Sequence, residues 1–597
     1  MHLGTPQLHA SCKVMSQPVR NFLPKYAKKW YSKQGLTCSF CQGKGHENYF
    51  CPATPYRPEP QHRVAFVENI LALKRVKTNK FLGLSWGEAR AWIDKNGASW
   101  NEGNPWEGSD KIFDRLRAKL GYWRAIGASD SVISWLGYGV PMRFVQQPKH
   151  RAFKNHKLTK EEEEYVDKDV KKHVESGCFV PAPPGSVKIC NPILCVHQGE
   201  KIRRCDDCRY GNAYQASPKF RMCSLKADIP LVVRPDDVQI TKDLEKAYYK
   251  VPLAPQAQPY LAFSWKGFYF LTMVMLFGMC QAPFYFTKIC RPIVRLFGAV
   301  KLPAVSFIDD WLWSPHKGKK ERAETFIAGI FSSLGWSFND KNQEGTRVQF
   351  LGLIIDSVKR EFVAPDAKIE KIRKLIAECV AAAAVPKRVL VTKLASLCGS
   401  ALSVSLAIPG VSTWTRSLYA QQYQGTQTVF LSAASMEELG VLDTMLMLSN
   451  GSAFIDPTHD KEMWVDTGEV GWGGAIDDIE VRGHMPKENI GTSSTARELF
   501  GLASVLRSEK VRQRIEGKVV LLHMDSMCSV RNLAKGGGPV EELVKWVKVI
   551  WRLCDEGNIT LIPKWLRRNA LMMQRVDALS KTGTLWLVDP TWALSIQ

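Results

Sequence analysis

The spacing of hydrophobic residues predicts an amphipathic helix that begins after Thr159. A glutamate follows three residues after this threonine, which is the arrangement of a capping box. Val166, Val170 and Val174 then recur at the four-residue interval of one helix face, and a glycine at 177 marks the expected end. We interpret the four consecutive glutamates near its start as a solvated first turn favoured by the helix dipole, not as an acidic site.

The hydrophobic pattern changes three more times along the chain. From 178 to 360, short β-rich runs alternate with helical ones, which predicts an α+β domain. Residues 365 to 455 are predicted to be mainly helical, because the isoleucines between Ile369 and Ile376 form an apolar stripe. From 458 onward, strand-like and helical segments alternate again, which predicts a separate α/β domain.

The chain is strongly basic. Its 597 residues include 81 Lys and Arg against 58 Asp and Glu, a formal net charge of +23, and the pI is about 9.3. Such an excess indicates a polyanionic partner, either nucleic acid or an acidic membrane surface. No apolar run is long enough to span a bilayer and no signal-peptide pattern begins the chain, so we expect nucleic acid rather than a membrane. The expected location is cytoplasmic or nuclear, not secreted, and the 16 cysteines are expected to be reduced.

A zinc-ligand pattern lies near the N-terminus. The spacing CxxCx4Hx4C is formed by Cys38, Cys41, His46 and Cys51. Three thiolates and one imidazole can close a tetrahedron around Zn²⁺, which would supply the folding energy of so short a segment. The pattern resembles the retroviral nucleocapsid zinc knuckle, a module that binds single-stranded nucleic acid. That family usually has an aromatic residue directly after the first cysteine, where this chain has Ser39.

Two adjacent aspartates, Asp309 and Asp310, lie in the otherwise apolar run VSFIDDWLW. Two ionised carboxylates in apolar surroundings are costly unless a cation compensates them, and metal ions are the strongest compensators. The apolar flanks predict a β-hairpin with the aspartates at its tip. Asp243 ends another predicted strand and offers the further carboxylate that two-metal phosphoryl transfer needs. The alternative interpretation of the pair is an ordinary Asp-Asp turn.

Six segments occur in the order and rough spacing of the fingers and palm of reverse transcriptases. They are KIRRCDDCRYGN, ITKDLEKAYYKVPL, FGMCQAPFYFTK, FIDDWL, NDKNQ and FLGLIID. Because several motifs in one order are more specific than any one alone, the region from about 160 to 360 resembles these polymerases. The resemblance implies a right-hand polymerase of fingers, palm and thumb that uses two Mg²⁺ ions, for which Mn²⁺ can substitute.

The resemblance also implies roles for individual residues. Asp243 and Asp309 match the Mg²⁺ ligands, and Asp310 matches the supporting carboxylate of the pair. Lys341 stands where the family has its candidate proton donor to pyrophosphate. The implied nucleotide-binding positions are Lys201 and Arg203 for the triphosphate, Tyr248 for rejection of a ribose 2′-OH, and Phe277 with Gly278 beside the nucleotide. This set favours dNTPs over NTPs.

Asp466 lies in the tripeptide Asp-Thr-Gly, which is also the signature of a retroviral aspartic protease. Protease chemistry needs two such aspartates that share a proton, which in a retroviral enzyme means a homodimer. The chain instead has further acids downstream, in TSSTAREL, LLHMDSMCSV and RVDALSK, which are Glu498, Asp525 and Asp577. Four acids on a strand, a helix, a second strand and a helix are the plan of an RNase H site that uses two Mg²⁺ ions.

Residues 458 to 583 resemble the RNases H of retroelements, in which such a site cuts the RNA strand of a hybrid. Arg567 stands where many of these enzymes have a mobile histidine. The resemblance therefore implies an activity that is slower or differently tuned.

The expected fold is a multidomain α+β protein, in which a right-hand polymerase is followed by an RNase H-like α/β domain and preceded by a small zinc knuckle. The expected segments are a basic tail with the knuckle (1–60), an N-terminal extension of unknown role (61–157), fingers and palm (158–360), a helical thumb and connection (361–455), an RNase H domain (456–585) and a C-terminal tail (586–597). The segments LGYWRAIGASDSVISWLGYGVPMRF and SLCGSALSVSLAIPG most resemble DIRS-type retrotransposons, which normally add a tyrosine recombinase; none is recognisable here.

The sequence thus predicts a retroelement enzyme that polymerises DNA on RNA and DNA templates and degrades the RNA of RNA–DNA hybrids. Expected partners are an RNA template, a DNA primer, the hybrid, dNTPs and other element-encoded proteins such as a recombinase. The alternative is a domesticated, non-catalytic nucleic-acid-binding relic. Such a relic has no need to retain all seven carboxylates, and all seven are present.

Overall fold

The structure is a computed structural model of the chain. It describes residues 61–183, 185–199, 201–216, 218–383, 388–423, 425–454 and 458–581. The predicted zinc ligands Cys38, Cys41, His46 and Cys51 lie outside these ranges, as does the predicted tail from 586. The chain separates into two compact units, with the boundary between Val348 and Gln349. Within the described residues, no helix is both long enough and apolar enough to cross a membrane.

Four helices begin the described part of the first unit and share its main hydrophobic core. They are α4 (Gln61–Ala72), α5 (Trp86–Asn101), α6 (Leu120–Ala125) and α7 (Asp130–Tyr138). Buried residues of these helices belong to the same cluster as Phe297 and Phe331, far along the chain. The indole N–H of Trp123 donates to the carbonyl of Leu334 at 3.1 Å. Because one apolar surface is buried jointly, the N-terminal extension is part of the core of this unit.

The helix predicted after Thr159 is confirmed as α8 (Lys160–Glu175). The Thr159 hydroxyl accepts the Glu162 N–H at 3.2 Å, and the Glu162 carboxylate accepts the Thr159 N–H at 2.7 Å. Glu162 is only 9% exposed, and its second oxygen lies 3.0 Å from Nε2 of His197. The glutamate run is therefore not wholly solvated, because Glu162 joins α8 to the neighbouring hairpin.

The sheet beside α8 has the strand order β1-β3-β7-β8-β2 and is accompanied by a separate hairpin of β4 and β5. The strands are β1 (Arg151–Ala152), β2 (Phe179–Pro181), β3 (Ile189–Asn191), β4 (Ile193–Gln198), β5 (Lys201–Asp206), β7 (Ala262–Trp265) and β8 (Phe268–Thr272). Two short helices follow β5, α9 (Arg209–Asn212) and α10 (Leu225–Val232). Val166 and Val170 of α8 pack with Phe263 in one small core.

A four-stranded antiparallel sheet of order β11-β6-β10-β9 forms the centre of the first unit. Its strands are β6 (Gln239–Asp243), β9 (Ala304–Phe307), β10 (Asp310–Trp313) and β11 (Gln343–Gly345), and its helices are α11 (Ala282–Ala299) and α12 (Lys320–Ser333). Trp311 and Trp313 are fully buried and meet Phe331 of α12 edge to face, with ring centroids 5.0 and 5.5 Å apart. The predicted hairpin around the aspartate pair is therefore confirmed, and its apolar side anchors it in the core.

After three short strands at its start, the second unit has a mainly helical region, as the sequence predicts for 365 to 455. Its helices are α13 (Asp366–Ala383), α14 (Val391–Leu402), α15 (Arg416–Gln422) and α16 (Ala433–Leu448). The strands of this region are β12 (Arg347–Phe350), β13 (Leu353–Asp356), β14 (Glu361–Val363), β15 (Val389–Leu390), β16 (Thr428–Val429) and β17 (Ser452–Ala453). Ile372 and Ile376 of the predicted apolar stripe are buried.

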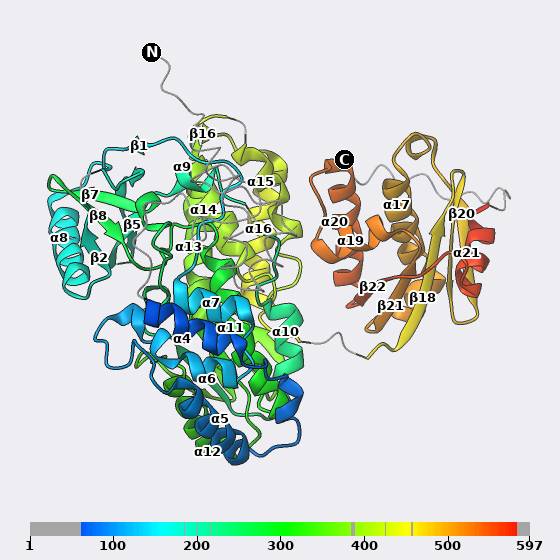
Figure 1. The fold of residues 1–597 in the computed structure, drawn as a ribbon. Coiled ribbons are helices and arrows are strands. Elements are labelled where there is room, and N and C mark those ends of the chain that lie inside the picture. Colours follow the sequence, from blue (N-terminus) through cyan, green and yellow to red (C-terminus); the bar gives the residue numbers. More distant parts are fainter. Residues whose placement is uncertain are drawn as a thin grey trace, which may run out of the picture. The chain divides into compact units, whose positions relative to one another are not determined.

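The last part of the second unit is a five-stranded sheet of order β20-β19-β18-β21-β22. Its strands are β18 (Lys461–Thr467), β19 (Gly471–Ile476), β20 (Ile479–His484), β21 (Val519–Met524) and β22 (Thr560–Trp565). Its helices are α17 (Ser494–Arg507), α18 (Glu509–Ile515), α19 (Met527–Lys535), α20 (Glu541–Glu556) and α21 (Leu571–Lys581). Helices α17 and α20 lie on one face of the sheet and α21 on the other (Figure 1). Because β18 and β21 are parallel neighbours, their carboxyl ends meet at one edge.

Candidate active sites

The first carboxylate group lies where β6 and β10 run side by side. Asp243 and Asp310 are direct partners in the antiparallel register of these strands. Asp310 also pairs with Phe307, so Ile308 and Asp309 form the two-residue turn of the hairpin. The N–H of Leu244 donates to the carbonyl of Asp309 at 3.0 Å, which ties the turn to the end of β6. The structure thus brings the three predicted aspartates to one end of the sheet.

The turn that carries Asp309 has an unusual backbone conformation. Ile308 has φ = +55°, in the left-handed region that β-branched residues rarely adopt. Such a conformation costs on the order of 1–3 kcal/mol and persists only where its surroundings impose it. Here the side chain of Ile308 packs against the main core, which holds the turn in place. The carboxylate of Asp309 is therefore presented on a rigid, strained turn.

Burial disfavours negative charge on two of the three aspartates. Burial, reinforced by the charges of Asp309 and Asp243, raises the pKa of Asp310 to about 6. The pKa of Asp309 is also raised, first by burial and then by Asp243, while a backbone hydrogen bond and the charge of Arg203 oppose the shift. A divalent cation would remove this cost. The donor set fits Mg²⁺, which binds through one or two carboxylates and substrate phosphates.

Asn339 is a polar contact of this site that the sequence interpretation did not assign. Its Nδ2 donates to Oδ2 of Asp243 at 2.6 Å, and its backbone N–H donates to the Asp243 carbonyl at 2.8 Å. These two bonds fix the orientation of the Asp243 side chain. The available signal was the motif NDKNQ, of which Asn339 is the first residue.

The predicted nucleotide-binding residues surround this group unevenly. Tyr248 is 2% exposed, and its ring lies under the exposed ring of Phe277, with centroids 4.5 Å apart. A Cβ on Gly278 would lie 2.3 Å from the carbonyl oxygen of Asp206, so only glycine fits. Arg203 is close enough for its charge to act on Asp309.

Two predicted lysines lie in more open surroundings. Lys201 lines a surface pocket of about 560 Å³ with Arg203 and residues of α8. Lys341 is exposed in the segment between α12 and β11. The structure therefore brings neither lysine into the buried group of aspartates.

The second carboxylate group is more compact. Asp466 near the end of β18, Glu498 on α17 and Asp525 directly after β21 each offer an oxygen, and these oxygens lie within 4.8 Å of one another. Among the described residues, no other set of three acidic, histidine or cysteine side chains meets this distance. The group forms because two parallel neighbouring strands deliver both aspartates to one edge, where α17 passes.

Burial and the neighbouring carboxylates disfavour negative charge on two members of this trio. Burial, reinforced by Asp466 and Asp525, raises the pKa of Glu498 to about 9. Burial and the charge of Asp525 raise the pKa of Asp466 to about 6. Oδ1 of Asp466 and Oε2 of Glu498 are buried and have no hydrogen-bond partner in the described part of the chain. Two unsatisfied carboxylate oxygens that converge with a third carboxylate fit a divalent metal ion.

Asp577, the fourth predicted acid, lies beside the trio but is not part of it. Its charge raises the pKa of Asp466, and its own carboxylate forms an ion pair with Lys581 at 2.6 Å. Ser580, one turn along α21, donates its hydroxyl to Oδ2 of Asp466 at 3.1 Å. The sequence interpretation did not assign Ser580, although it lies in the quoted motif RVDALSK.

The basic residue at the trio is Arg568, one position after the predicted Arg567. Both arginines are exposed, but Arg568 donates from Nε to Oδ2 of Asp525 at 2.6 Å. The protease interpretation of Asp466 finds no support in this geometry. The aspartate lies within a strand of a five-stranded sheet and converges with a glutamate and an aspartate of the same chain.

Comparisons with known proteins gave matches only among solved structures. No protein-family model and no curated protein matches the chain. A foamy viral protease-reverse transcriptase in complex with an RNA/DNA hybrid is similar over 91% of this chain and 68% of its own, with 12% identity and a TM-score of 0.46. A dRH form of the foamy viral protein with double-stranded DNA matches over 86% and 84% at 13% identity, TM-score 0.45. A third structure, with double-stranded DNA, matches over 83% and 99% at 12% identity, TM-score 0.45. All three TM-scores are below 0.5, so these likenesses carry no argument about the function of this chain.

Proposed function

We propose that the chain is a retroelement reverse transcriptase that polymerises DNA on RNA and DNA templates and degrades the RNA strand of hybrids. The observation that supports this most directly is the trio of Asp466, Glu498 and Asp525, with its converging and unsatisfied oxygens. A second, separate group of aspartates at the tip of a rigid hairpin lies in the other unit. Two carboxylate sites in one basic chain fit two phosphodiester reactions on nucleic acid.

In the polymerase site, Asp243 and Asp309 would hold Mg²⁺ and Asp310 would support them. The metal, when bound, supplies charge stabilisation for phosphoryl transfer from a dNTP to the primer hydroxyl. Asn339 orients Asp243 for this task. Tyr248 is proposed to exclude a ribose 2′-OH, and Gly278 is proposed to allow the backbone to approach the nucleotide; the burial of the Tyr248 ring and the close packing around Gly278 are compatible with these roles. Arg203 and Lys201 are proposed to contact the triphosphate, and Lys341 to give a proton to the pyrophosphate.

In the RNase H site, Asp466, Glu498, Asp525 and Asp577 would hold Mg²⁺, which activates water when bound. Ser580 donates to one oxygen of Asp466, and the other oxygen is buried without a partner among the described residues, which leaves it available to a metal ion. Arg568 neutralises part of the charge of Asp525 and holds its carboxylate in one orientation.

The zinc knuckle of Cys38, Cys41, His46 and Cys51 and a DIRS-like origin belong to the same proposal and are supported by the sequence motifs alone. Other element-encoded proteins, such as a recombinase, are proposed partners.

The experiment that tests the RNase H assignment is cleavage of a 5′-labelled RNA in an RNA–DNA hybrid, with Mg²⁺ and with Mn²⁺. We expect cleavage by the full chain and its loss in Asp466→Asn. If the full chain leaves the hybrid intact in both metals, the trio is a relic and the non-catalytic alternative is favoured.

A further inference from the structure

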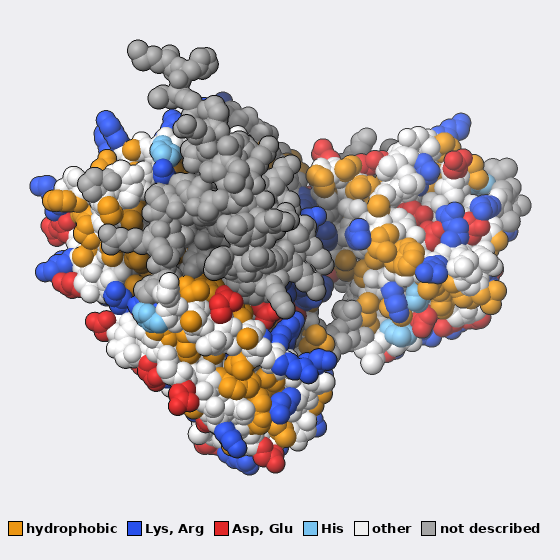
Figure 2. Space-filling view, in the orientation of Figure 1, with side chains coloured by type: hydrophobic (Ala, Val, Ile, Leu, Met, Phe, Trp, Pro, Cys, Tyr) orange, Lys and Arg blue, Asp and Glu red, His pale blue; other side chains and the backbone are white. Residues whose placement is uncertain are grey.

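A basic pocket in the first unit contains no residue of either carboxylate site. Its volume is about 590 Å³, and it is lined by parts of α7, of α11 and of the chain around Lys219. Six of its lining residues are basic, Arg75, Arg143, Lys219, Lys288, Arg291 and Arg295. None of the described residues that line it is acidic. Figure 2 shows a group of Lys and Arg side chains on this face near the place where Figure 1 labels α10.

Three of these cations form a stripe along one face of α11. Lys288, Arg291 and Arg295 are spaced i, i+3 and i+7, so they point to the same side of the helix. A rise of about 1.5 Å per residue places the first and last about 10 Å apart along the axis. Burial lowers the pKa of Lys288, and the charges of Arg291 and Arg295 lower it further. None of the described residues that line the pocket is acidic, so the stripe is an extended positive surface.

Two aromatic residues line the pocket, Phe284 and Trp135, and both are buried. Arg143 and Lys288 lie 5.9 and 5.7 Å from the ring centroid of Phe284, and Trp135 meets the same ring at 6.0 Å. Because Trp135 is only 7% exposed and Phe284 only 8%, little aromatic surface is available here for base stacking. Arg75 is held at the rim because its Nε donates to the carbonyl of Gly127 at 3.1 Å. The pocket is thus built to recognise negative charge rather than base identity.

We propose that this pocket binds the phosphate backbone of a single-stranded nucleic acid. Its three-cation stripe suits a chain of regularly spaced phosphates better than one isolated anion. Hydroxyl groups of Ser129 and Ser131 at the start of α7 add the kind of donor that phosphate contacts commonly use. Its volume admits a few sugar-phosphate groups and not the width of a duplex. The site gives the N-terminal helices a function in addition to their part in the core.

The test is the affinity of the full chain for a labelled oligouridylate of about 20 nucleotides. Fluorescence anisotropy is measured at several salt concentrations without divalent metal, with unlabelled RNA–DNA hybrid present in saturating amount to fill the proposed active sites. The variant is Arg291→Gln/Arg295→Gln. The control is Lys319→Gln/Arg322→Gln, which removes the same charge from exposed positions at the start of α12.

We expect the Arg291→Gln/Arg295→Gln variant to bind about tenfold more weakly. The slope of log K against log[salt] is expected to decrease in magnitude by about 1.4, because each lost phosphate contact lowers it by about 0.7 on single strands. The control is expected to bind like the unmodified chain. Equal affinity and slope in variant and control would overturn the proposal. If the double variant does not fold, Arg295→Gln alone, at an exposed position, is expected to lower the slope by about 0.7, and an unchanged slope would again overturn it.

An anionic membrane is the competing partner for such a surface. Vesicles that contain phosphatidylserine distinguish the two. If the double variant loses vesicle binding but keeps its affinity for the oligouridylate, the pocket binds lipid and the proposal is wrong. Because the measurement needs no catalysis, its result is independent of whether the chain is an active polymerase.

Discussion

Glu498 is a buried carboxyl group of the trio, and its surroundings oppose its ionisation. It is 6% exposed, and burial with two neighbouring carboxylates raises its pKa from 4.5 to about 9. In the absence of metal the folded protein therefore holds this proton at neutral pH, while the unfolded chain releases it near its ordinary pKa. A group with a raised pKa in the folded state favours folding below the unfolded pKa, and this contribution is lost as the pH rises through the folded pKa.

The first prediction is a pH effect on stability. Without divalent metal, the thermal midpoint of the full chain is expected to fall from pH 5 to pH 9, and Glu498→Gln is expected to flatten this dependence because its neutral amide cannot ionise. Thermal denaturation followed by circular dichroism measures this. Glu488→Gln, at an exposed glutamate, is the control and should keep the original slope. Identical slopes for Glu498→Gln and the control would contradict the assigned protonation.

Gly278 gives a second prediction at the residue scale. An added methyl group would lie 2.3 Å from a backbone oxygen of Asp206, so the backbone must shift. We expect Gly278→Ala to lower the free energy of unfolding by about 1–3 kcal/mol and to reduce primer extension. The matched control is Gly298→Ala within α11, where a Cβ meets nothing within 4 Å and alanine favours the helix. Stability of Gly278→Ala equal to that of Gly298→Ala would contradict this explanation of the glycine.

Several residue positions could be predicted from the sequence and others could not. Asp243, Asp309 and Asp310 were found because each stands at the end of an apolar strand pattern. Ser580, Asn339 and Arg568 were not assigned, because small polar or basic residues are common at surfaces and acquire these contacts only through tertiary folding. Periodicity does not determine which of two adjacent arginines in a loop turns toward a carboxylate.

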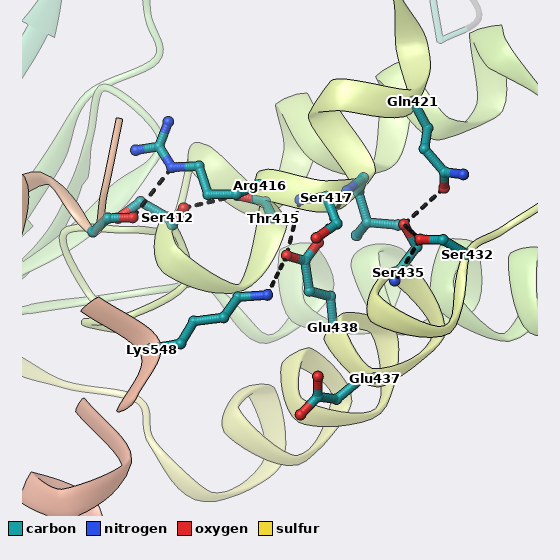
Figure 3. A network of polar contacts seen from close by, with 12 residues as sticks. Ser412, Thr415, Arg416, Ser417, Gln421, Ser432, Ser435, Glu437, Glu438 and Lys548 are labelled. Carbon is teal, nitrogen blue, oxygen red and sulfur yellow. Dashed lines mark hydrogen bonds and ion pairs between the residues drawn. The ribbon is translucent and has the colours of Figure 1, made fainter. Parts of the chain in front are cut away.

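At the scale of elements, the second unit contains a polar joint between its helical region and the sheet region (Figure 3). Glu438 on α16 is fully buried, and its carboxylate accepts the backbone N–H groups of Ser417 and Leu418 at 2.9 Å. Lys548 on α20 donates to the same carboxylate at 2.8 Å. Arg416 donates to the carbonyls of Lys535 and Gly537 at the end of α19, both at 2.9 Å. These bonds connect α15 and α16 with α19 and α20.

The third prediction concerns this joint. Lys548→Met leaves the Glu438 charge buried without its cation, so we expect the free energy of unfolding of this unit to fall by about 3 kcal/mol. Lys545→Met, at an exposed position of the same helix, should change it little. The double variant Glu438→Gln/Lys548→Met is expected to recover part of the loss, because no buried charge remains. Thermal denaturation of the four proteins tests this, and equal loss for Lys548→Met and Lys545→Met would contradict a role for the ion pair.

Element patterns were predicted well where local rules decide them. The capped helix after Thr159 and the hairpin of VSFIDDWLW follow from nearby residues and are confirmed. The participation of α4 to α7 in the main core was not predicted, since contacts such as Trp123 with Leu334 join residues 211 positions apart. Non-local contacts of this kind leave no trace in the local periodicity.

At the scale of the whole molecule, the two carboxylate groups lie in different compact units. Each has its own core and its own acids, so their activities are expected to be separable. The fourth prediction is that Asp466→Asn lowers hybrid cleavage by at least about a thousandfold while primer extension is retained. Both activities are measured on the same preparation, and a loss of both in a folded variant would contradict separate centres.

Primer extension by the full chain tests the central claim most directly. A DNA primer annealed to a homopolymer RNA template is incubated with the complementary dNTP in Mg²⁺ or Mn²⁺. We predict extension by the unmodified chain and none by Asp309→Asn, which should still cleave the hybrid. No extension by the unmodified chain in either metal, or equal extension by Asp309→Asn, would contradict the assignment of this chain as a reverse transcriptase.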